Sequence, residues 1–485
     1  MKNTIFLRTS QHSVVGKNLI KKQTMGKQRL ISILCCMIIL SFLLSEPVNA
    51  QLTDIPLVER ESSASKIIYV RHDATGANDG SSWEDARTNL QTALTNASNG
   101  DEVWVASGTY KPTADSDRSA TFQLKNGVEI YGGFDGLEDK RDQRDWQTQT
   151  TILSGDIQDN NNSYHVVTAN GADSTTVIDG FTITKGYAES SSGGGMYADD
   201  GEPTVINCIF INNTSDMDGG GMYNNGSPTL INCSFINNTS DSGGGGGMYN
   251  NGSPSLINCS FINNTSDDDG GGMYNNGSPS LINCSFINNC SARDSGGGLS
   301  ITGGSPILDG CIFTDNSSYS HGGGVHMNIS NTVVTDCTFR NNEITDDNSF
   351  GAGMAVYGGT ARIVNSTFDS NYAYRDNNGG GLGIVNSDSE IISCTFFNNN
   401  ADYGGGIYIK GGNSSVIHCT LTGNTAYYGG QGIYNTGSSN LTLINTIISD
   451  NIYSSSFSDV YNDGGIINSN YNIVKFPSRL SPWRK

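Results

Sequence analysis

The sequence predicts an all-β protein, a parallel β-helix whose coils stack as a solenoid, with a capping α-helix near its N-terminal end. Three glycines followed by an apolar residue recur at a nearly fixed interval along residues 193–451. Between these words lie only short apolar runs, separated by Gly, Asn, Asp and Ser, so the long helices of helical repeats do not fit. Short strands at a fixed period are typical of a β-solenoid.

Two words set the period, and each recurs ten times at steps of 25 to 29 residues. The glycine word, which Ala352 and Gln431 interrupt, ends at Met196, Met222, Met248, Met273, Leu299, Val325, Met354, Leu382, Ile407 and Ile433. The second word is an apolar residue followed three positions later by Asn, as in Phe210/Asn213, Phe235/Asn238, Phe261/Asn264, Phe286/Asn289, Phe313/Asn316, Phe339/Asn342, Phe368/Asn371, Phe396/Asn399, Leu421/Asn424 and Ile448/Asn451.

The stacking of equivalent residues explains why one sequence segment is repeated. In a β-helix each side chain lies on the same position of the next coil, so Phe stacks on Phe and Met on Met. Asn can form amide ladders and tolerates left-handed backbone at bends. Three copies are nearly identical (Gly219–Asn238, Gly245–Asn264 and Gly270–Asn289), which indicates duplicated coils that add length and surface, not three active sites.

The N-terminal part has a different organisation. Residues 1–50 read as a signal peptide, because basic residues precede the apolar run Leu30–Leu44 and "EPVNA" follows, with cleavage expected before Gln51. Residues 51–65 read as a polar linker. Residues 66–110 are predicted to form a strand, helix and strand, with the helix starting near Ser82 and ending at Asn99-Gly100. Residues 111–192 are expected to be irregular first coils, interrupted by a charged surface loop at Leu137–Trp146.

At the repeated words the chain resembles a known group. "FINN" and "GGGM" are similar to the repeats of polymorphic outer membrane proteins and, more broadly, to right-handed parallel β-helix repeat proteins of bacterial surfaces. The resemblance covers about residues 193–451 and implies a pectate-lyase-like fold and a secreted or cell-surface, outer-membrane-associated location. The third glycine of each word departs from the Ala of that family. Residues 452–485 are expected to be a last coil and a tail, truncated relative to similar chains.

Charge limits the partners. The chain carries 27 Lys and Arg and 47 Asp and Glu, for a net charge of −20. Such a surface should repel nucleic acid and anionic lipid. No segment after residue 50 is apolar enough for a transmembrane helix. No cofactor motif is present, so no cofactor or metal is expected.

Cysteines stand in register two positions before the second word, which predicts a buried column of reduced thiols: Cys208, Cys233, Cys259, Cys284, Cys311, Cys337, Cys394 and Cys419. A metal ladder or disulfides are the alternatives. Cys290 replaces a Thr and is expected on a turn, as a free reactive thiol. The acidic turns (Asp216, Asp218, Asp267, Asp268, Asp269 and Asp294) read as solvated turns, with Ca²⁺ binding as the alternative.

Tyrosines follow the glycine words and should point outward if the preceding apolar residue points in. Tyr223, Tyr249 and Tyr274 are therefore the candidate ligand surface, which could stack on sugar rings. A surface ladder that stabilises the sheet is the alternative interpretation.

Two functions remain open. The first is a non-catalytic scaffold or adhesin that binds extracellular polysaccharide or a neighbouring or host cell surface. The second is a polysaccharide lyase or glycoside hydrolase, for which no catalytic residue can be assigned. If a cleft exists, it is expected near residues 340–410, with Glu343, Asp346, Asp347 and Glu390 as acids and Arg340, Arg362, Arg375 and Lys410 as bases. His321 and His326 lack a third metal ligand.

Overall fold

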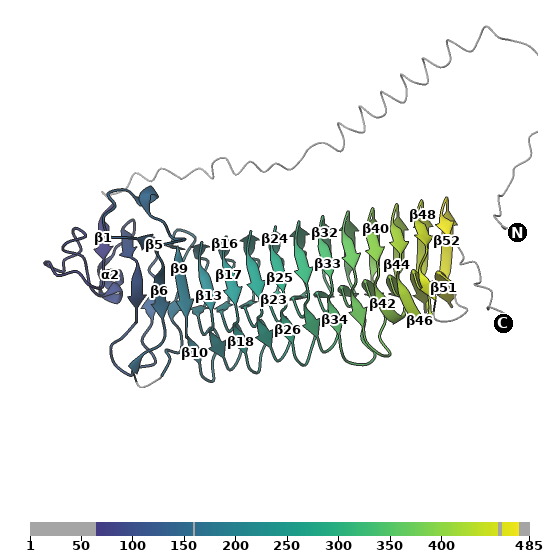
Figure 1. Cartoon of the computed structure of the whole chain (residues 1–485), viewed down its shortest axis with the longest axis horizontal. Coiled ribbons are helices and arrows are strands. Elements are labelled where there is room, and N and C mark those ends of the chain that lie inside the picture. Colours follow the sequence, from purple (N-terminus) through teal and green to yellow (C-terminus); the bar gives the residue numbers. More distant parts are fainter. Residues whose placement is uncertain (1–64, 159–160, 454–457, 475–485) are drawn as a thin grey trace, which may run out of the picture. The chain divides into compact units, whose positions relative to one another are not determined.

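The computed structural model describes residues 65–158, 161–453 and 458–474. The predicted signal peptide and nearly all of the predicted linker lie outside these residues. Within them, four parallel sheets run along a stack of coils (Figure 1). Each regular coil contributes one strand to sheet 1, then to sheets 2, 3 and 4, before the chain enters the next coil.

Sheets 1 and 2 hold the first two strands of each regular coil. Sheet 1 has 15 strands: β1 (Ile67–Val70), β2 (Glu102–Ala106), β5 (Glu129–Phe134), β8 (Val177–Asp179), β12 (Thr204–Ile206), β16 (Thr229–Ile231), β20 (Ser255–Ile257), β24 (Ser280–Ile282), β28 (Ile307–Asp309), β32 (Asn331–Thr335), β36 (Thr360–Val364), β40 (Asp388–Ile392), β44 (Asn413–Ile417), β48 (Asn440–Ile444) and β52 (Ile466–Asn470). Sheet 2 has 14 strands: β3 (Gly108–Tyr110), β6 (Thr151–Ser154), β9 (Phe181–Thr184), β13 (Ile209–Ile211), β17 (Ser234–Ile236), β21 (Ser260–Ile262), β25 (Ser285–Ile287), β29 (Ile312–Thr314), β33 (Thr338–Arg340), β37 (Thr367–Asp369), β41 (Thr395–Phe397), β45 (Thr420–Thr422), β49 (Ile447–Ser449) and β53 (Ile473–Val474).

Sheets 3 and 4 complete each coil. Sheet 3 has 11 strands: β10 (Tyr187–Ala188), β14 (Thr214–Ser215), β18 (Thr239–Ser240), β22 (Thr265–Ser266), β26 (Cys290–Ser291), β30 (Ser317–Ser318), β34 (Glu343–Ile344), β38 (Tyr372–Ala373), β42 (Asn400–Tyr403), β46 (Thr425–Gly429) and β50 (Ile452–Tyr453). Sheet 4 has 13 strands: β4 (Phe122–Gln123), β7 (Val167–Thr168), β11 (Met196–Ala198), β15 (Met222–Asn224), β19 (Met248–Asn250), β23 (Met273–Asn276), β27 (Leu299–Thr302), β31 (Val325–Asn328), β35 (Met354–Tyr357), β39 (Leu382–Val385), β43 (Ile407–Lys410), β47 (Ile433–Thr436) and β51 (Val460–Asp463).

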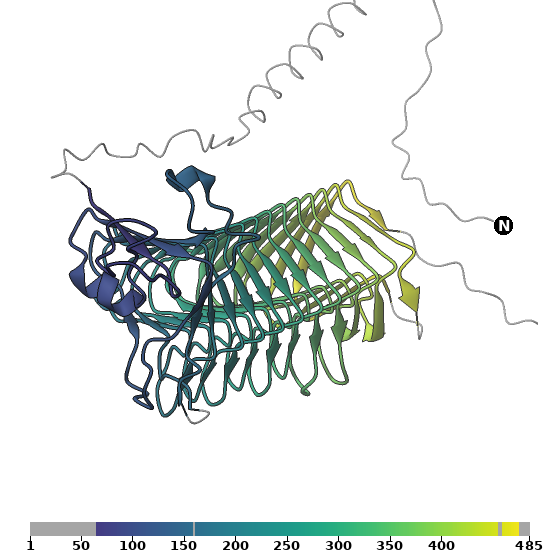
Figure 2. The ribbon, with the colours of Figure 1, turned by 60° about the vertical axis from the view of Figure 1, so that its left-hand side comes forward.

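The coils lie one behind another in register, strand beside strand (Figure 2). Equivalent residues of successive coils are direct partners, so like side chains stack along the β-helix. Met222 pairs with Met248, which pairs with Met273. Eight stacked phenylalanines form one interior column, with successive ring centroids 4.6 to 5.2 Å apart, from Phe210 to Phe396. All are fully buried, which confirms the predicted apolar interior.

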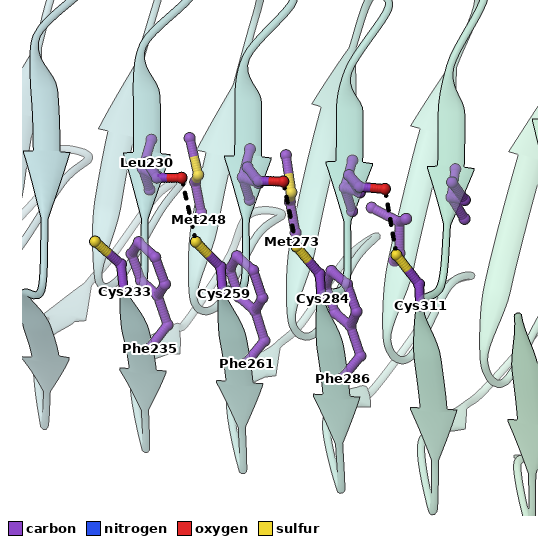
Figure 3. Packing of buried hydrophobic residues seen from close by; sticks show 14 of the residues in the cluster. Leu230, Cys233, Phe235, Met248, Cys259, Phe261, Met273, Cys284, Phe286 and Cys311 are labelled. Carbon is purple, nitrogen blue, oxygen red and sulfur yellow. Dashed lines mark hydrogen bonds between the residues drawn. The ribbon is translucent and has the colours of Figure 1, made fainter. Parts of the chain in front are cut away.

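The predicted cysteine column is also interior. All eight thiols are buried and free. Figure 3 shows four of them, Cys233, Cys259, Cys284 and Cys311. Each contacts a main-chain carbonyl of a neighbouring coil, as Cys284 Sγ does at 3.5 Å from Leu256 O. The prediction that Cys290 lies on a turn is wrong: it belongs to β26 and pairs with Thr265 and Ser317. The reason is that its coil keeps the short strand of sheet 3, and Cys fills the strand position that Thr holds elsewhere.

Asparagines form a second interior column. The side-chain amide of Asn238 donates to Asn264 Oδ1 at 3.0 Å and to the carbonyl of Phe210 at 2.9 Å. The backbone N–H of Asn238 also donates to Asn264 Oδ1. The same pattern continues from Asn213 to Asn451, with every member almost completely buried. The residue before each buried Asn takes the left-handed conformation that makes the bend, as at Asn237, with φ of 52°; in most coils this residue is also Asn.

The predicted helix is shorter than expected. Helix α2 (Leu90–Asn96) begins at the N-cap Asn89, not near Ser82. Asp85 N–H does donate to Ser82 Oγ, but the chain then pairs with the free edge of β1, where Arg87 N–H donates to the carbonyl of Tyr69 at 2.8 Å. An open strand edge needs hydrogen-bond partners, and this need overrides the helical periodicity. Leu90, Ala93 and Leu94 of α2 pack into the same hydrophobic cluster as the coils.

Candidate functional site

Sheet 1 widens along the β-helix. In five coils a proline (Pro203, Pro228, Pro254, Pro279 and Pro306) stands directly before the strand, and β12, β16, β20, β24 and β28 have three residues each. Proline has no N–H for the ladder, so pairing starts after it. From β32 to β52 the proline is absent, and these strands have five residues each.

The widened part of sheet 1 carries a groove on its outer face, with a volume of about 840 Å³. Two outward rows line it, in register from strand to strand. One row is Asn331, Thr360, Asp388, Asn413 and Asn440, and the other is Val333, Arg362, Glu390, Ser415, Thr442 and Asn468. Amides and hydroxyls therefore dominate its surface.

The charged groups of the groove are already engaged. Arg362 Nε lies 3.4 Å from Glu390 Oε2, and both side chains are more than half exposed. Asp388 Oδ1 accepts hydrogen bonds from the backbone N–H of Asn413 at 2.6 Å and from its side-chain amide at 3.1 Å. The lining contains one cation and two carboxylates, so its formal charge is −1.

The other residues considered for a catalytic cleft do not come together. Arg340 ends β33 of sheet 2 and pairs with Asp369, whereas Glu343 lies in β34 of sheet 3. Lys410 ends β43 of sheet 4. Asp346, Asp347 and Arg375 lie in the turns between sheets 3 and 4. Only Arg362 and Glu390 meet, because residues near in sequence occupy different faces of one coil.

The tyrosine column lies on the outer face of sheet 4, as the alternation predicts. The rings of Tyr197, Tyr223, Tyr249 and Tyr274 stack with centroids 5.3, 5.5 and 4.8 Å apart and interplanar angles of 9° to 19°. The ring centroid of His165 lies 4.9 Å from that of Tyr197, at the N-terminal end of the column. The stacked rings cover one another's faces, so their edges and hydroxyl groups point outward.

Beyond Tyr274 the same face carries a partly buried polar cluster. Ser300 Oγ donates to Asp269 Oδ1 at 3.3 Å and lies 3.4 Å from His326 Nδ1. Burial, the neighbouring carboxylate of Asp294 and that of Asp268 raise the pKa of Asp269 to about 7, while burial and the nearby His321 lower the pKa of His326 to about 3. Asp269 lies in a turn, as the sequence predicts, but it is half-buried because it packs beside Ser300, and 30% of its side chain is exposed.

This cluster is not a hydrolytic triad. Asp269 and Ser300 both approach the same ring nitrogen of His326, whereas a triad uses the two ring nitrogens separately. Ser300 is also almost completely buried and cannot reach a polymer. Among the described residues, no group of three or more His, Cys, Asp or Glu has a geometry suited to a metal ion.

Comparisons with known proteins agree with this architecture. The family description "Right handed beta helix region" matches residues 201–373, and the description "Chlamydia polymorphic membrane protein (Chlamydia_PMP) repeat" matches residues 393–410. The chain is a right-handed parallel β-helix repeat protein. A search of curated proteins gives no match.

Several solved structures are similar to this β-helix repeat protein at low identity. The mannuronan C-5 epimerase AlgE6 A-module of Azotobacter vinelandii is 12% identical, with 80% of this chain and 95% of that chain covered and a TM-score of 0.37. Pectate lyase Pel9A is 13% identical, with 85% and 80% covered and a TM-score of 0.33. The GH87 α-1,3-glucanase of Streptomyces thermodiastaticus is 14% identical, with 87% and 71% covered and a TM-score of 0.40.

The cleft expected near residues 340–410 overlaps the groove, which Arg362 and Glu390 line, but the rest of its lining and its place on sheet 1 were not predicted. The sequence does contain a signal for it. The "GSP" turn does not recur after Pro306, and each later strand of sheet 1 is two residues longer than β28. The loss of the proline predicts a longer strand in sheet 1 from Asn331 onward, which is where the groove begins.

Proposed function

We propose that this β-helix repeat protein is a non-catalytic scaffold that binds a neutral polysaccharide chain along the groove of sheet 1. The observation that carries the proposal is the lining of that groove, which crosses six strands and consists mainly of amides and hydroxyls. Sugar hydroxyls both donate and accept hydrogen bonds, and amide and hydroxyl side chains match both roles. An elongated groove of this kind fits an extended polymer better than a compact metabolite.

Charge supports a neutral polymer over a uronic acid polymer. A polyuronate carries a negative charge on each sugar, and the groove offers one arginine that is already paired with Glu390. Asp388 adds a further negative charge, and the whole chain has a net charge of −20. Repulsion of like charges therefore disfavours an acidic chain.

The tyrosine column is the second candidate surface for a glycan. Sugars stack on the faces of aromatic rings, and here each inner face is covered by the next tyrosine. The column could offer edges and hydroxyl groups from Tyr223, Tyr249 and Tyr274. The groove is favoured because its hydrogen-bonding groups face a hollow.

A glycoside hydrolase or lyase is the alternative function. Asp388 and Glu390 have one residue between them, so both side chains leave β40 on its outer face. Inverting hydrolases hold two carboxyl groups about 6.5–9.5 Å apart. Against this alternative, Glu390 is paired with Arg362 and Asp388 accepts hydrogen bonds from Asn413, so both carboxylates already have partners.

Binding and product analysis on the same samples test the proposal. Wild-type protein is mixed with soluble neutral glucans, mannans and xylans and, as an acidic comparison, with polygalacturonate and alginate. We expect saturable binding to at least one neutral polymer, weaker binding to the acidic ones, and no new reducing or unsaturated ends. Shortening of a polymer that is lost in both D388N and E390Q would support the enzyme instead.

We also propose a secreted or cell-surface location, with cleavage before Gln51. This part of the proposal rests on the basic and apolar pattern of residues 1–50 and on the repeat match at residues 393–410. Across the described ranges, no helix combines the length and hydropathy needed to cross a bilayer. In the same arrangement helix α2 would serve as the N-terminal cap that covers the first coil.

A further inference from the structure

Trp146 differs from the other described tryptophans. Trp83 and Trp104 pack with Tyr69 and Phe134 in an aromatic cluster outside the first strands of sheet 1. Trp146 is half-buried and lies at the end of the charged insertion between β5 and β6. Within the described part of the chain, its ring has no aromatic partner and its indole N–H donates no hydrogen bond.

The backbone holds Trp146 firmly in place. The preceding Asp145 N–H donates to the carbonyl of Gly133 at 2.8 Å. A Cβ atom at Gly133 would lie 2.4 Å from Trp146 Cα, and one at Gly180 would lie 3.0 Å from Trp146 Cβ. Only glycine allows this approach at both positions. Arg144 is in turn ion-paired with Asp179, and both side chains are nearly buried.

The Trp146 side chain lines a hollow of about 220 Å³ on the outer face of β6, β9 and β13. Gln147, Thr150, Thr182 and Asn207 contribute polar atoms, and no charged side chain lines the hollow. Asn207 is already bonded to Asp179 and Asn232. The side chains of Gln147, Thr150 and Thr182 have no hydrogen-bond partner among the described residues.

We propose that this hollow is a binding site for a single neutral sugar residue, either a chain end or one unit of a glycan. The apolar face of the sugar would lie on the indole ring, and its hydroxyls would bond to Gln147, Thr150 and Thr182. The volume is below the roughly 300 Å³ of pockets for drug-sized ligands, which suits one sugar ring. The site lies by sheet 2 near the N-terminal coils, whereas the groove lies on sheet 1 from β32 to β52.

The test is saturation-transfer NMR with methyl glycosides of glucose, galactose, mannose and N-acetylglucosamine. We expect at least one probe to receive saturation from wild-type protein with a measurable Kd. W146A should weaken that Kd by roughly tenfold or more. Q147A and T182A should each weaken it less, and W146F should retain part of the affinity because it keeps an aromatic face.

Two controls separate this site from the groove and from misfolding. S415W, which fills the groove on sheet 1, should leave the Kd of the methyl glycoside unchanged. Circular dichroism and the melting temperature of W146F and Q147A should match the wild type. The proposal is overturned if no probe binds, if binding survives W146A, or if S415W alone abolishes it.

Discussion

Arg362 and Glu390 lie on the adjacent strands β36 and β40, with Nε and Oε2 3.4 Å apart on the outer face of sheet 1. Both side chains are more than half exposed, so the pair contributes at most about 1 kcal/mol to stability. Its larger effect is on the charge of the groove, because Glu390 pairs with Arg362, the one cation in the lining. The groove is then left with amides, hydroxyls and Asp388.

Neutralising Glu390 tests this view of the groove. In E390Q the charge of the lining changes from −1 to 0 and Arg362 loses its ionic partner. We expect binding of polygalacturonate to rise and binding of a neutral glucan to change by less than about threefold. Affinity electrophoresis at low salt measures both. A large loss of neutral glucan binding would instead give Glu390 a direct contact with the ligand.

The asparagine column should be a major source of stability. N264A removes the oxygen that accepts from the Asn238 backbone and side chain, and the amide that donates to Asn289 and to the carbonyl of Phe235. Leaving such buried groups unpaired costs about 1–3 kcal/mol each. We expect a loss of about 2–4 kcal/mol in urea unfolding.

A matched variant on the same coil serves as the control. Asn263 is exposed and has a φ of 55°, a conformation that glycine adopts freely. N263G should change the unfolding free energy by less than about 0.5 kcal/mol. If N263G and N264A lowered the free energy of unfolding equally, the buried amide ladder would not be the source of the stability.

Asp269 should make stability depend on pH. Its pKa in the folded protein is about 7, against about 3.9 for an unfolded Asp, so the native state binds the extra proton between these values. Stability from this group is therefore lost as pH rises from about 4 to about 7. His326 acts in the opposite direction, since its lowered pKa costs stability as pH falls below about 6.5.

D269N isolates the first effect. The amide oxygen can still accept from Ser295 N–H and Ser300 Oγ, while the titration is removed. Solvent screens this charge because 30% of the Asp269 side chain is exposed, so the gain in stability is small. We expect the Tm of D269N to exceed that of the wild type by about 1–3 °C near pH 8 and to differ little from it near pH 4. The exposed D347N is the control. A lower Tm for D269N near pH 8 would contradict the assigned pKa.

The thiol column should resist labelling. Burial raises the pKa of Cys208 to about 12, and all eight column cysteines are buried and free. Cys290 is half-buried in sheet 3 and should react first with iodoacetamide in the native protein, as read by peptide mapping. C290S should then show no fast-reacting thiol in the described residues. If Cys233 or Cys259 were labelled as fast as Cys290, the cysteine column would lie on the outer surface of the β-helix.

One coil should be removable without loss of the fold. Met248 pairs with Met273, so this coil has 25 residues, and deleting residues 245–269 brings Gly244 to Gly270 in register. The β-helix should shorten by about 4.8 Å and stay folded, because each coil contacts mainly its neighbours. Small-angle scattering and circular dichroism check this. Deleting half of that coil should abolish folding, and tolerance of the half deletion would contradict the register.

The repeated words predicted most of the fold because each coil repeats the same local rules. Phe235 and Cys259 could be assigned to the interior from alternation and period alone. Asn264 could not, because it lies three positions after Phe261 and is turned inward only by the left-handed bend at Asn263. The helix start at Ser82 was wrong because the free edge of β1 captures that segment, a tertiary effect that periodicity does not contain.

The candidate site was harder to predict than the coils. A linear search groups residues 340–410, but the coil distributes them over four sheets. Arg362 and Glu390 meet because they are one coil apart in register, not because they are near in sequence. The Trp146 hollow depends on two glycines, Gly133 and Gly180, whose role appears only when the insertion is folded back.

The most direct test of the central claim is the affinity of S415W for the neutral polymer that the wild type binds best. Ser415 points into the groove from β44, so a tryptophan there fills the groove without changing its charge. S285W, on the outer face of β25 in sheet 2, is the matched control. The account predicts at least about tenfold weaker binding for S415W, unchanged binding for S285W and an intact polymer in every sample. Equal affinity of S415W and wild type, or shortening of the polymer by the wild type, would contradict it.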